Sequence, residues 1–244
     1  MKKIIYLLTL PFVLALMPSC NSNGEYVDYG GTICYSYWTF SFGTQYKELP
    51  NVNPATFKSI ENWLGHDDSH VYFKNRLIEG ANPKTIKAKK YPLCCDSRDY
   101  YYMGKSMNVA NLRNFEVINQ NDDDIWAVDS KYAYYDSIRI DSVDLATFKL
   151  QTYNTATDCN HVYRYGTILP LADPKTYVEN WKGLYSRDKA HIWYCGDLLD
   201  DVDYDTFVID DQGPRDKNGH FYHGERISEE EWKELISRNE SLDM

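Results

Sequence analysis

The most regularly spaced side chains in this sequence that could do chemistry are six aspartates. They follow one another at intervals of 28 to 33 residues, as Asp67, Asp96, Asp129, Asp158, Asp188 and Asp216. Carboxylates in equivalent places could share a cation or a proton, but calcium loops supply several oxygen side chains at alternating positions around a tight glycine. Here the residues two and four places after the aspartates include Arg98, Lys131 and Ile192. We therefore favour the other interpretation, in which each aspartate caps a turn by accepting backbone N–H bonds.

Histidines and cysteines are the other candidate metal ligands. His70, His161 and His191 each stand three places after an aspartate, and in stacked repeats they could form a column that binds a metal or titrates near neutral pH. No carboxylate is fixed beside all three, so we predict neither a metal site nor a cofactor. Five cysteines follow Cys20, an odd number, and the adjacent Cys94 and Cys95 lack the zinc spacing Cys-x-x-Cys. We expect these cysteines to fill small apolar spaces in the core, either all as free thiols or with one disulfide bond among them.

Aromatic residues are abundant and could line a groove for a carbohydrate or a peptide, because aromatic faces stack on apolar ligand surfaces. Most of the 22 tyrosines and six tryptophans fall on the repeat period, as a core requires. Trp63, Trp126 and Trp181 lie off that period, which makes them the better binding candidates, with packing as the alternative. The sequence has no Gly-x-Ser-x-Gly elbow, P-loop, His-Glu-x-x-His or glycine-rich dinucleotide turn. It therefore predicts no catalytic residues.

The elements that must position these side chains repeat with the same period. The fifth residue after each aspartate is aromatic and the eleventh is apolar, as in Tyr72 and Ile78. The seventh and eighth, for example Tyr165-Gly166, suit a two-residue hairpin turn with positive φ. Such a turn pairs the fourth residue with the eleventh and the fifth with the tenth. Both faces of the hairpin are then largely apolar, so neighbouring repeats must cover it.

A second repeated motif, which we call the second signature, begins fifteen residues after most of the aspartates. It is typical of a turn followed by a strand. Its copies span residues 82–86, 111–115, 144–148, 173–177 and 203–207, with an isolated copy at 53–57. We predict an all-β domain over residues 34–227, made of about seven tandem hairpin repeats of about three short strands each. The first repeat is degenerate and the last is truncated. The array is either open and curved or propeller-like.

The C-terminal residues 228–244 are predicted to form a short capping helix and a tail. Ser228 and Glu231 have the spacing of a capping box, and Trp232, Leu235 and Ile236 fall on one helical face. An apolar face of this kind suits a helix that covers the exposed last repeat.

Several repeat segments resemble a known family. Asp188-Lys189, Asp216-Lys217-Asn218, His161-Val162-Tyr163 and the run from Ala172 to Tyr177 are similar to the DKNYY repeat family of bacterial envelope and secreted proteins. The resemblance covers about residues 50–227, and the four earlier repeats replace the Lys-Asn that follows the aspartate. The family carries no assigned activity, so the resemblance implies no catalytic residues.

The N-terminus reads as a targeting signal. Lys2 and Lys3 precede an apolar stretch over residues 4–17 that is too short to span a bilayer comfortably, so residues 1–19 are predicted to be a signal peptide. Ser19-Cys20 resembles a bacterial lipobox, with Met17 where leucine is usual. This resemblance implies that Cys20 carries the lipid, that residues 20–33 are an anchor or linker, and that the protein is held in the bacterial cell envelope.

The net charge and the targeting signal together limit the classes of function that we expect. The full chain has a net charge of −10, and without Lys2 and Lys3 this becomes −12, with no basic run, so we expect no nucleic-acid binding. We predict a non-catalytic envelope lipoprotein that acts as a scaffold or binding module for a protein or glycan partner and meets the membrane through its lipid. The alternative is a hydrolase that acts on envelope glycans or peptides through an unrecognised site.

Overall fold

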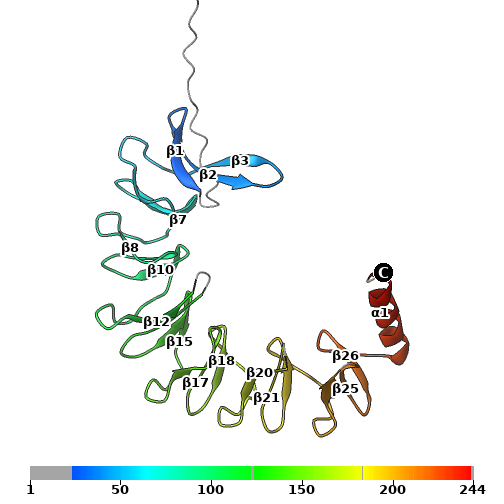
Figure 1. Ribbon diagram of the computed structural model, residues 1–244. Helices are drawn as coiled ribbons and strands as arrows, with labels where there is room; N and C mark the ends of the chain where they lie inside the picture. The colour runs from blue at the N-terminus through cyan, green and yellow to red at the C-terminus, as the bar shows by residue number, and fades with distance from the viewer. Residues whose placement is uncertain (1–23, 122–123, 183, 211, 243–244) are drawn as a thin grey trace, which may run out of the picture. The chain divides into compact units, whose positions relative to one another are not determined.

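The computed structural model describes residues 24–121, 124–182, 184–210 and 212–242. Cys20, the predicted lipid attachment residue, lies outside these residues. Seven small antiparallel sheets and one helix make up the described part of the chain (Figure 1), which confirms the all-β prediction with its C-terminal helix. The helix among these described residues is not long and apolar enough to cross a membrane. The chain divides between Leu77 and Ile78 into two compact units.

The first unit contains two sheets. Strands β1 (Glu25–Tyr29), β2 (Thr32–Thr39) and β3 (Gly43–Glu48) form a meander in which β2 is central. A four-stranded sheet follows, with β4 (Lys58–Glu61), β5 (Leu64–His66), β6 (Val71–Phe73) and β7 (Arg76–Leu77) in sequence order. Ile33, Tyr35 and Leu49 pack with Tyr72 in one core, so the two sheets of this unit share their hydrophobic side chains.

The second unit contains five four-stranded sheets, and the strands within each are neighbours in sequence order. The sheets are β8 (Lys87–Ala88), β9 (Leu93–Cys95), β10 (Tyr100–Tyr102) and β11 (Lys105–Ser106); β12 (Glu116–Gln120), β13 (Ile125–Val128), β14 (Ala133–Tyr135) and β15 (Ile138–Ile140); β16 (Lys149–Leu150), β17 (Thr155–Thr157), β18 (Val162–Arg164) and β19 (Thr167–Ile168); β20 (Val178–Lys182), β21 (Tyr185–Arg187), β22 (Ile192–Tyr194) and β23 (Asp197–Leu198); and β24 (Val208–Asp210), β25 (Gly213–Asp216), β26 (Gly219–Tyr222) and β27 (Glu225–Ile227). Helix α1 (Glu229–Leu242) ends the unit.

The tight hairpin predicted from the repeat forms the last two strands of every four-stranded sheet. The first residue of each turn has a positive φ of 47° to 54°, at Lys74, Met103, Asp136, Tyr165, Cys195 and His223. Where the second residue is glycine, its φ is positive too, as in Gly166, which is the geometry of a type I′ turn. The predicted register is confirmed, because Leu169 N–H donates to Val162 O over 2.8 Å and Tyr72 pairs with Leu77.

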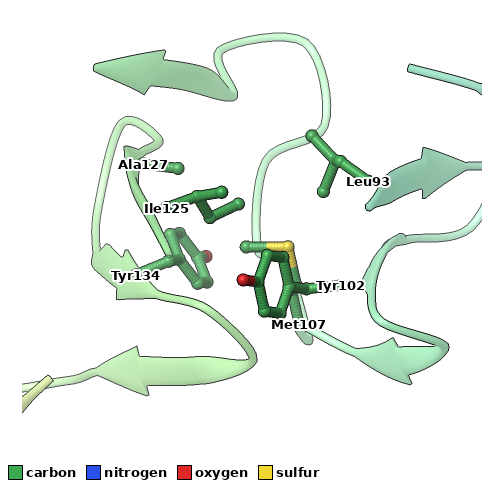
Figure 2. Close-up of a cluster of buried hydrophobic side chains, with 6 residues drawn as sticks. All are labelled: Leu93, Tyr102, Met107, Ile125, Ala127 and Tyr134. Carbon is green, nitrogen blue, oxygen red and sulfur yellow. The ribbon is translucent and has the colours of Figure 1, made fainter. Parts of the chain in front are cut away.

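Successive sheets of the second unit bury their apolar side chains against one another. Figure 2 shows one such cluster, in which Leu93, Tyr102 and Met107 from one repeat point toward Ile125 and Tyr134 from the next. Met107, Ile125 and Tyr134 are fully buried. Because a two-faced apolar hairpin cannot be stable alone in water, each repeat depends on its neighbours for its core.

The capping box that was predicted at the start of α1 is present. Ser228 N–H donates to the Glu231 carboxylate over 2.8 Å, and Glu231 N–H donates to Ser228 Oγ over 3.3 Å. The Trp232 ring stacks on His220 of β26, with ring centroids 4.4 Å apart and planes 10° apart. The helix therefore covers part of the last sheet, as its apolar face predicts.

The boundaries of the repeats differ from those predicted. Each repeated sheet has four strands instead of about three, because the strand launched by the second signature pairs with a further strand that leads into the aspartate. A repeat thus begins at the signature, and the β24–β27 sheet is complete at Ile227 and not truncated. Residues 25–29, expected within the anchor or linker, form β1, and β2 begins at Thr32.

Candidate functional site

The repeated aspartates lie where two turns of the same sheet meet. Asp158 shows the arrangement: its Oδ1 accepts the N–H groups of Asn160 and His161, each over 2.7 Å. Its Oδ2 accepts Asp144 N–H over 2.8 Å and the Tyr163 hydroxyl over 2.7 Å. The side chain is fully buried. One carboxylate thus ties the entrance of the hairpin to the turn that launches the first strand.

All six aspartates make the same two kinds of backbone contact. Each accepts the N–H of the residue two places on, namely Ser69, Arg98, Lys131, Asn160, Ala190 and Asn218. Each also accepts the N–H of the first signature residue, namely Asn53, Asn82, Asn111, Asp144, Asp173 and Asp203. The aspartates therefore cap turns in every repeat, and most of their lone pairs are already occupied.

The fifth residue after the aspartate adds a side-chain donor in four repeats. The hydroxyls of Tyr72, Tyr101, Tyr134 and Tyr163 donate to the aspartates over 2.7 to 3.2 Å. Trp193 replaces this tyrosine beside Asp188. Phe221 replaces it beside Asp216, where Arg226 instead donates two bonds of 2.8 Å each. In all six repeats the aromatic ring stays in the core and the carboxylate stays hydrogen-bonded.

In five of the six repeats these contacts favour the ionised form of the carboxylate and lower its pKa. Burial by itself would raise the pKa of Asp67, but the backbone N–H groups of Asn53, Ser69 and His70 outweigh it and lower the pKa to about 2. The same balance lowers the pKa of Asp129, Asp158 and Asp188. Buried carboxylates that are saturated with donors and ionised at neutral pH are poor general acids and bases.

The lysine that follows two of the aspartates has a defined partner. Lys189 Nζ lies 2.7 Å from Asp173 Oδ2, and Lys217 forms the equivalent ion pair with Asp203. In the three repeats whose signature begins with asparagine, the residue after the aspartate is Asp68, Ser97 or Ser130. The lysine thus occurs only opposite an aspartate at the start of the signature. In the remaining repeat the signature also begins with an aspartate, Asp144, but there the thiol of Cys159 contacts it over 3.2 Å in place of a lysine.

The three histidines lie beside their own aspartates. Nδ1 of His70 and of His191 is 3.3 Å from the nearest carboxylate oxygen, and that of His161 is 3.7 Å away. Among the residues that the structure describes, no three histidine, cysteine or acidic side chains are grouped so that they could hold a metal ion. Cys34, Cys94, Cys95, Cys159 and Cys195 are free thiols, and the first three are buried.

The tryptophans proposed as binding residues lie in cores where they are described. Trp126 is fully buried between Tyr135 and Phe148, and its Nε1 donates to Tyr153 O over 2.9 Å. Trp63 is 6% exposed and packs against Phe73. Neither ring therefore offers a face to a ligand. Trp126 lies in β13 and Trp63 lies in the turn just before β5, and the repeat pattern did not reveal either of these strands. The side chain of Trp181 lies outside the described part.

Exposed aromatic residues instead gather on the first sheet. Trp38, Phe40, Phe42, Tyr29 and Tyr46 are 58%, 92%, 78%, 65% and 49% exposed. Trp38 and Phe40 form an edge-to-face pair with centroids 6.2 Å apart, and Tyr29 stacks on Tyr46 at 5.0 Å. Sequence reasoning missed these residues because it looked for aromatics relative to the aspartate period, which begins after this sheet. An aromatic run without charged residues was the signal available.

A groove in the second unit lies along two successive copies of the second signature. It has a volume of about 730 Å³ and is lined by residues 146–149, Gln151, residues 157–159, Pro174 and Lys175. Lys149 and Lys175 are exposed, Phe148 and Pro174 are half-buried, and Asp158 is buried. The groove thus combines apolar ring surface with two ammonium groups in a chain that is acidic as a whole.

The fold and the aspartate-centred turns define a class of all-β tandem-repeat proteins in which neighbouring sheets of a unit share their cores. The sequence model of the DKNYY family matches residues 31–197, and the chain belongs to the DKNYY family. Comparison with curated proteins and with solved structures gave no match.

Proposed function

We propose that this protein is a lipid-anchored protein of the bacterial cell envelope whose repeats bind a protein or glycan partner. The groove at Phe148, Lys149, Pro174 and Lys175 carries the proposal, because it is a concave surface with apolar rings and exposed cations. The repeated aspartates support it indirectly, since they are committed to holding the sheets together. We therefore assign binding to the surface of the repeats and a structural role to the aspartates.

The groove favours an extended partner that is rich in hydroxyl or carboxylate groups. Lys149 and Lys175 can donate to such groups, and the Phe148 ring and Pro174 can contact the apolar face of a sugar or a peptide side chain. Because equivalent signatures recur along the second unit, weak contacts at several repeats would add to the affinity.

The binding proposal is tested by capture of envelope glycans and envelope proteins on the purified mature chain. Lys149→Glu combined with Lys175→Glu should weaken capture about tenfold, a loss typical of two charged contacts. The control is Lys105→Glu combined with Lys233→Glu, which changes the net charge equally at exposed positions away from the groove. Equal capture by both double variants would contradict a role for the groove.

The same preparations separate a binding module from a hydrolase. Incubation with envelope glycans and peptides should leave them uncleaved, while capture persists. Turnover that a single substitution abolished without changing the melting temperature would replace the binding proposal with the hydrolase alternative.

The anchor is tested separately. Metabolic labelling with a lipid analogue should label the wild-type protein, and Cys20→Ala should abolish the label and release the protein from the membrane fraction. Unlabelled, soluble wild-type protein would refute the anchor without affecting the groove.

A further inference from the structure

We propose that the β2–β3 hairpin of the first unit inserts its aromatic tip into the lipid bilayer next to the anchor. This inference rests on the proposed lipid on Cys20. The tip is the turn of residues 40–42 that joins β2 to β3, preceded by Trp38. Its partner is the interfacial region of a bilayer, where tryptophan is enriched and where the apolar rings of Phe40 and Phe42 can leave water.

The rings of Trp38, Phe40 and Phe42 lie outside the core of the first unit. Ile33 and Tyr35 of β2 are buried in the core of the first unit. Because side chains alternate along a strand, Trp38 lies on the opposite face of β2 from Tyr35. Phe40 and Phe42 extend beyond the strands and are almost fully exposed. Packing within the sheet therefore leaves these three rings without cover, a surface that costs free energy in water.

The tip of the hairpin also lies in a stretch of sequence without charged side chains. No aspartate, glutamate, lysine, arginine or histidine occurs between Asp28 and Lys47, although a quarter of the whole chain is charged. Insertion of the tip would therefore desolvate no charged side chain, which would be the largest cost of entering a bilayer. The acidic remainder of the chain is repelled by anionic lipid, so this hairpin is the part of the first unit best suited to membrane contact.

Nearby side chains form hydrogen bonds with the backbone of the tip. Thr39 Oγ1 donates to Gly43 O and accepts Phe42 N–H, both over 3.3 Å, and Gln45 Nε2 donates to Phe42 O over 2.8 Å. Backbone groups that are already hydrogen-bonded lose less when water is removed. A tip closed by its own side chains favours a bilayer over a protein partner that would supply hydrogen bonds.

The first sheet begins a few residues after the proposed anchor. Cys20 lies five residues before Glu25, the first residue of β1. Five residues span at most about 18 Å when fully extended. A lipid on Cys20 would hold the first sheet close to the bilayer, so even a weak preference of Phe40 and Phe42 for lipid would be satisfied at a high local concentration.

The experiment measures vesicle binding by the mature chain with Cys20→Ala, so that the hairpin acts without the lipid. We expect cosedimentation with phosphatidylcholine vesicles, and a loss of at least about tenfold for Phe40→Ser combined with Phe42→Ser. Tyr153→Ser, which removes a ring that is 56% exposed in the second unit, is the matched control and should bind as before. Lipids with brominated acyl chains should quench Trp38 fluorescence, and Trp38→Phe should remove that quenching.

Charge effects give a second readout. Vesicles that contain phosphatidylglycerol should bind the acidic chain less well at low salt, and this difference should disappear at high salt. Failure of the Cys20→Ala chain to bind any of these vesicles, or equal binding by the Phe40/Phe42 double variant, would overturn the proposal. So would self-association in the absence of lipid that depends on the same two residues. Lipid labelling in cells reports on the anchor independently, because the vesicle assay does not involve it.

Discussion

Replacing Asp129 with alanine removes the acceptor of four hydrogen bonds at the centre of one repeat. The N–H groups of Lys131, Tyr132 and Asn111 donate to it over 2.7, 2.8 and 2.9 Å, and the Tyr134 hydroxyl donates over 2.7 Å. Water can reach some of the backbone groups after the substitution, because Lys131 is exposed and Tyr132 is half-buried. The Tyr134 side chain is fully buried, so its hydroxyl loses its acceptor without replacement.

The magnitude follows from these partners. A buried donor that is left without an acceptor costs about 1 to 3 kcal/mol, and the partly hydrated backbone groups cost less. We expect Asp129→Ala to lower the free energy of unfolding by about 3 kcal/mol. Asp188→Ala removes the same backbone contacts and the contact with His191 Nδ1, but no hydroxyl contact, because Trp193 stands in place of the tyrosine. Its expected cost is about 2 kcal/mol.

Urea unfolding of both alanine variants, of Tyr134→Phe and of Asp129→Ala combined with Tyr134→Phe measures the hydroxyl contribution. The double-mutant cycle should give a coupling energy of about 1 kcal/mol between Asp129 and Tyr134. Additive effects of the two substitutions, with equal costs for Asp129→Ala and Asp188→Ala, would refute the assignment of the tyrosine hydroxyl as a stabilising partner. No loss of stability in either alanine variant would refute the capping role itself.

Three further outcomes are expected. Burial, reinforced by the charge of Asp124, raises the pKa of Asp136 to about 6, so ionisation of this carboxyl destabilises the fold as pH rises from about 4 to 6. Asp136→Asn should therefore stabilise the protein by about 1 kcal/mol at pH 7 and have no such effect at pH 4. Thermal unfolding at both pH values measures this difference. Asp67, whose pKa is lowered to about 2, contributes about 2 kcal/mol to the free energy of unfolding above pH 4, and this contribution is lost as pH falls toward 2. Asp67→Asn should therefore make stability less dependent on pH in acid. An unchanged midpoint of acid unfolding would contradict this. Trp193 is fully buried with Val162 and Leu169, so Trp193→Ala should cost about 3 to 5 kcal/mol in urea unfolding, whereas a lost ligand with unchanged stability would point to a binding role.

The hairpin of each repeat could be predicted because its signals are local. Gly166 and Gly196 mark turns that need a positive φ, and the aromatic and apolar residues on either side give the register. The strand that leads into the aspartate could not be predicted, since the residue three places before the aspartate varies from Leu64 to Trp126 to Thr155. Each of these three is buried, so the position is recognisable only by its surroundings. For the same reason Trp126, which looked irregular in sequence, proved to be an ordinary core residue.

The roles of the aspartates were open to sequence reasoning only in part. A turn cap follows from the preference of aspartate for turns, but the second carboxylate oxygen contacts a residue 13 to 18 places earlier in the chain. That contact depends on how the two turns of a sheet come together, which no local pattern specifies. Once it is known, the ion pair between Lys189 and Asp173 follows, because the next residue after the aspartate necessarily lies beside the same signature.

The aromatic residues of the first sheet differ in kind from those of the repeats. Tyr72, Tyr134 and Tyr163 are fully buried, and each one both fills a core and donates to an aspartate. Phe40 and Phe42 do neither. Exposed rings of this kind do not stabilise the fold, and they favour association with another molecule. Stacking between repeats thus accounts for the periodic aromatics and leaves the tip of the β2–β3 hairpin to be explained by an interaction outside the chain. The absence of charge from residues 29–46 makes a bilayer the partner that this tip fits best.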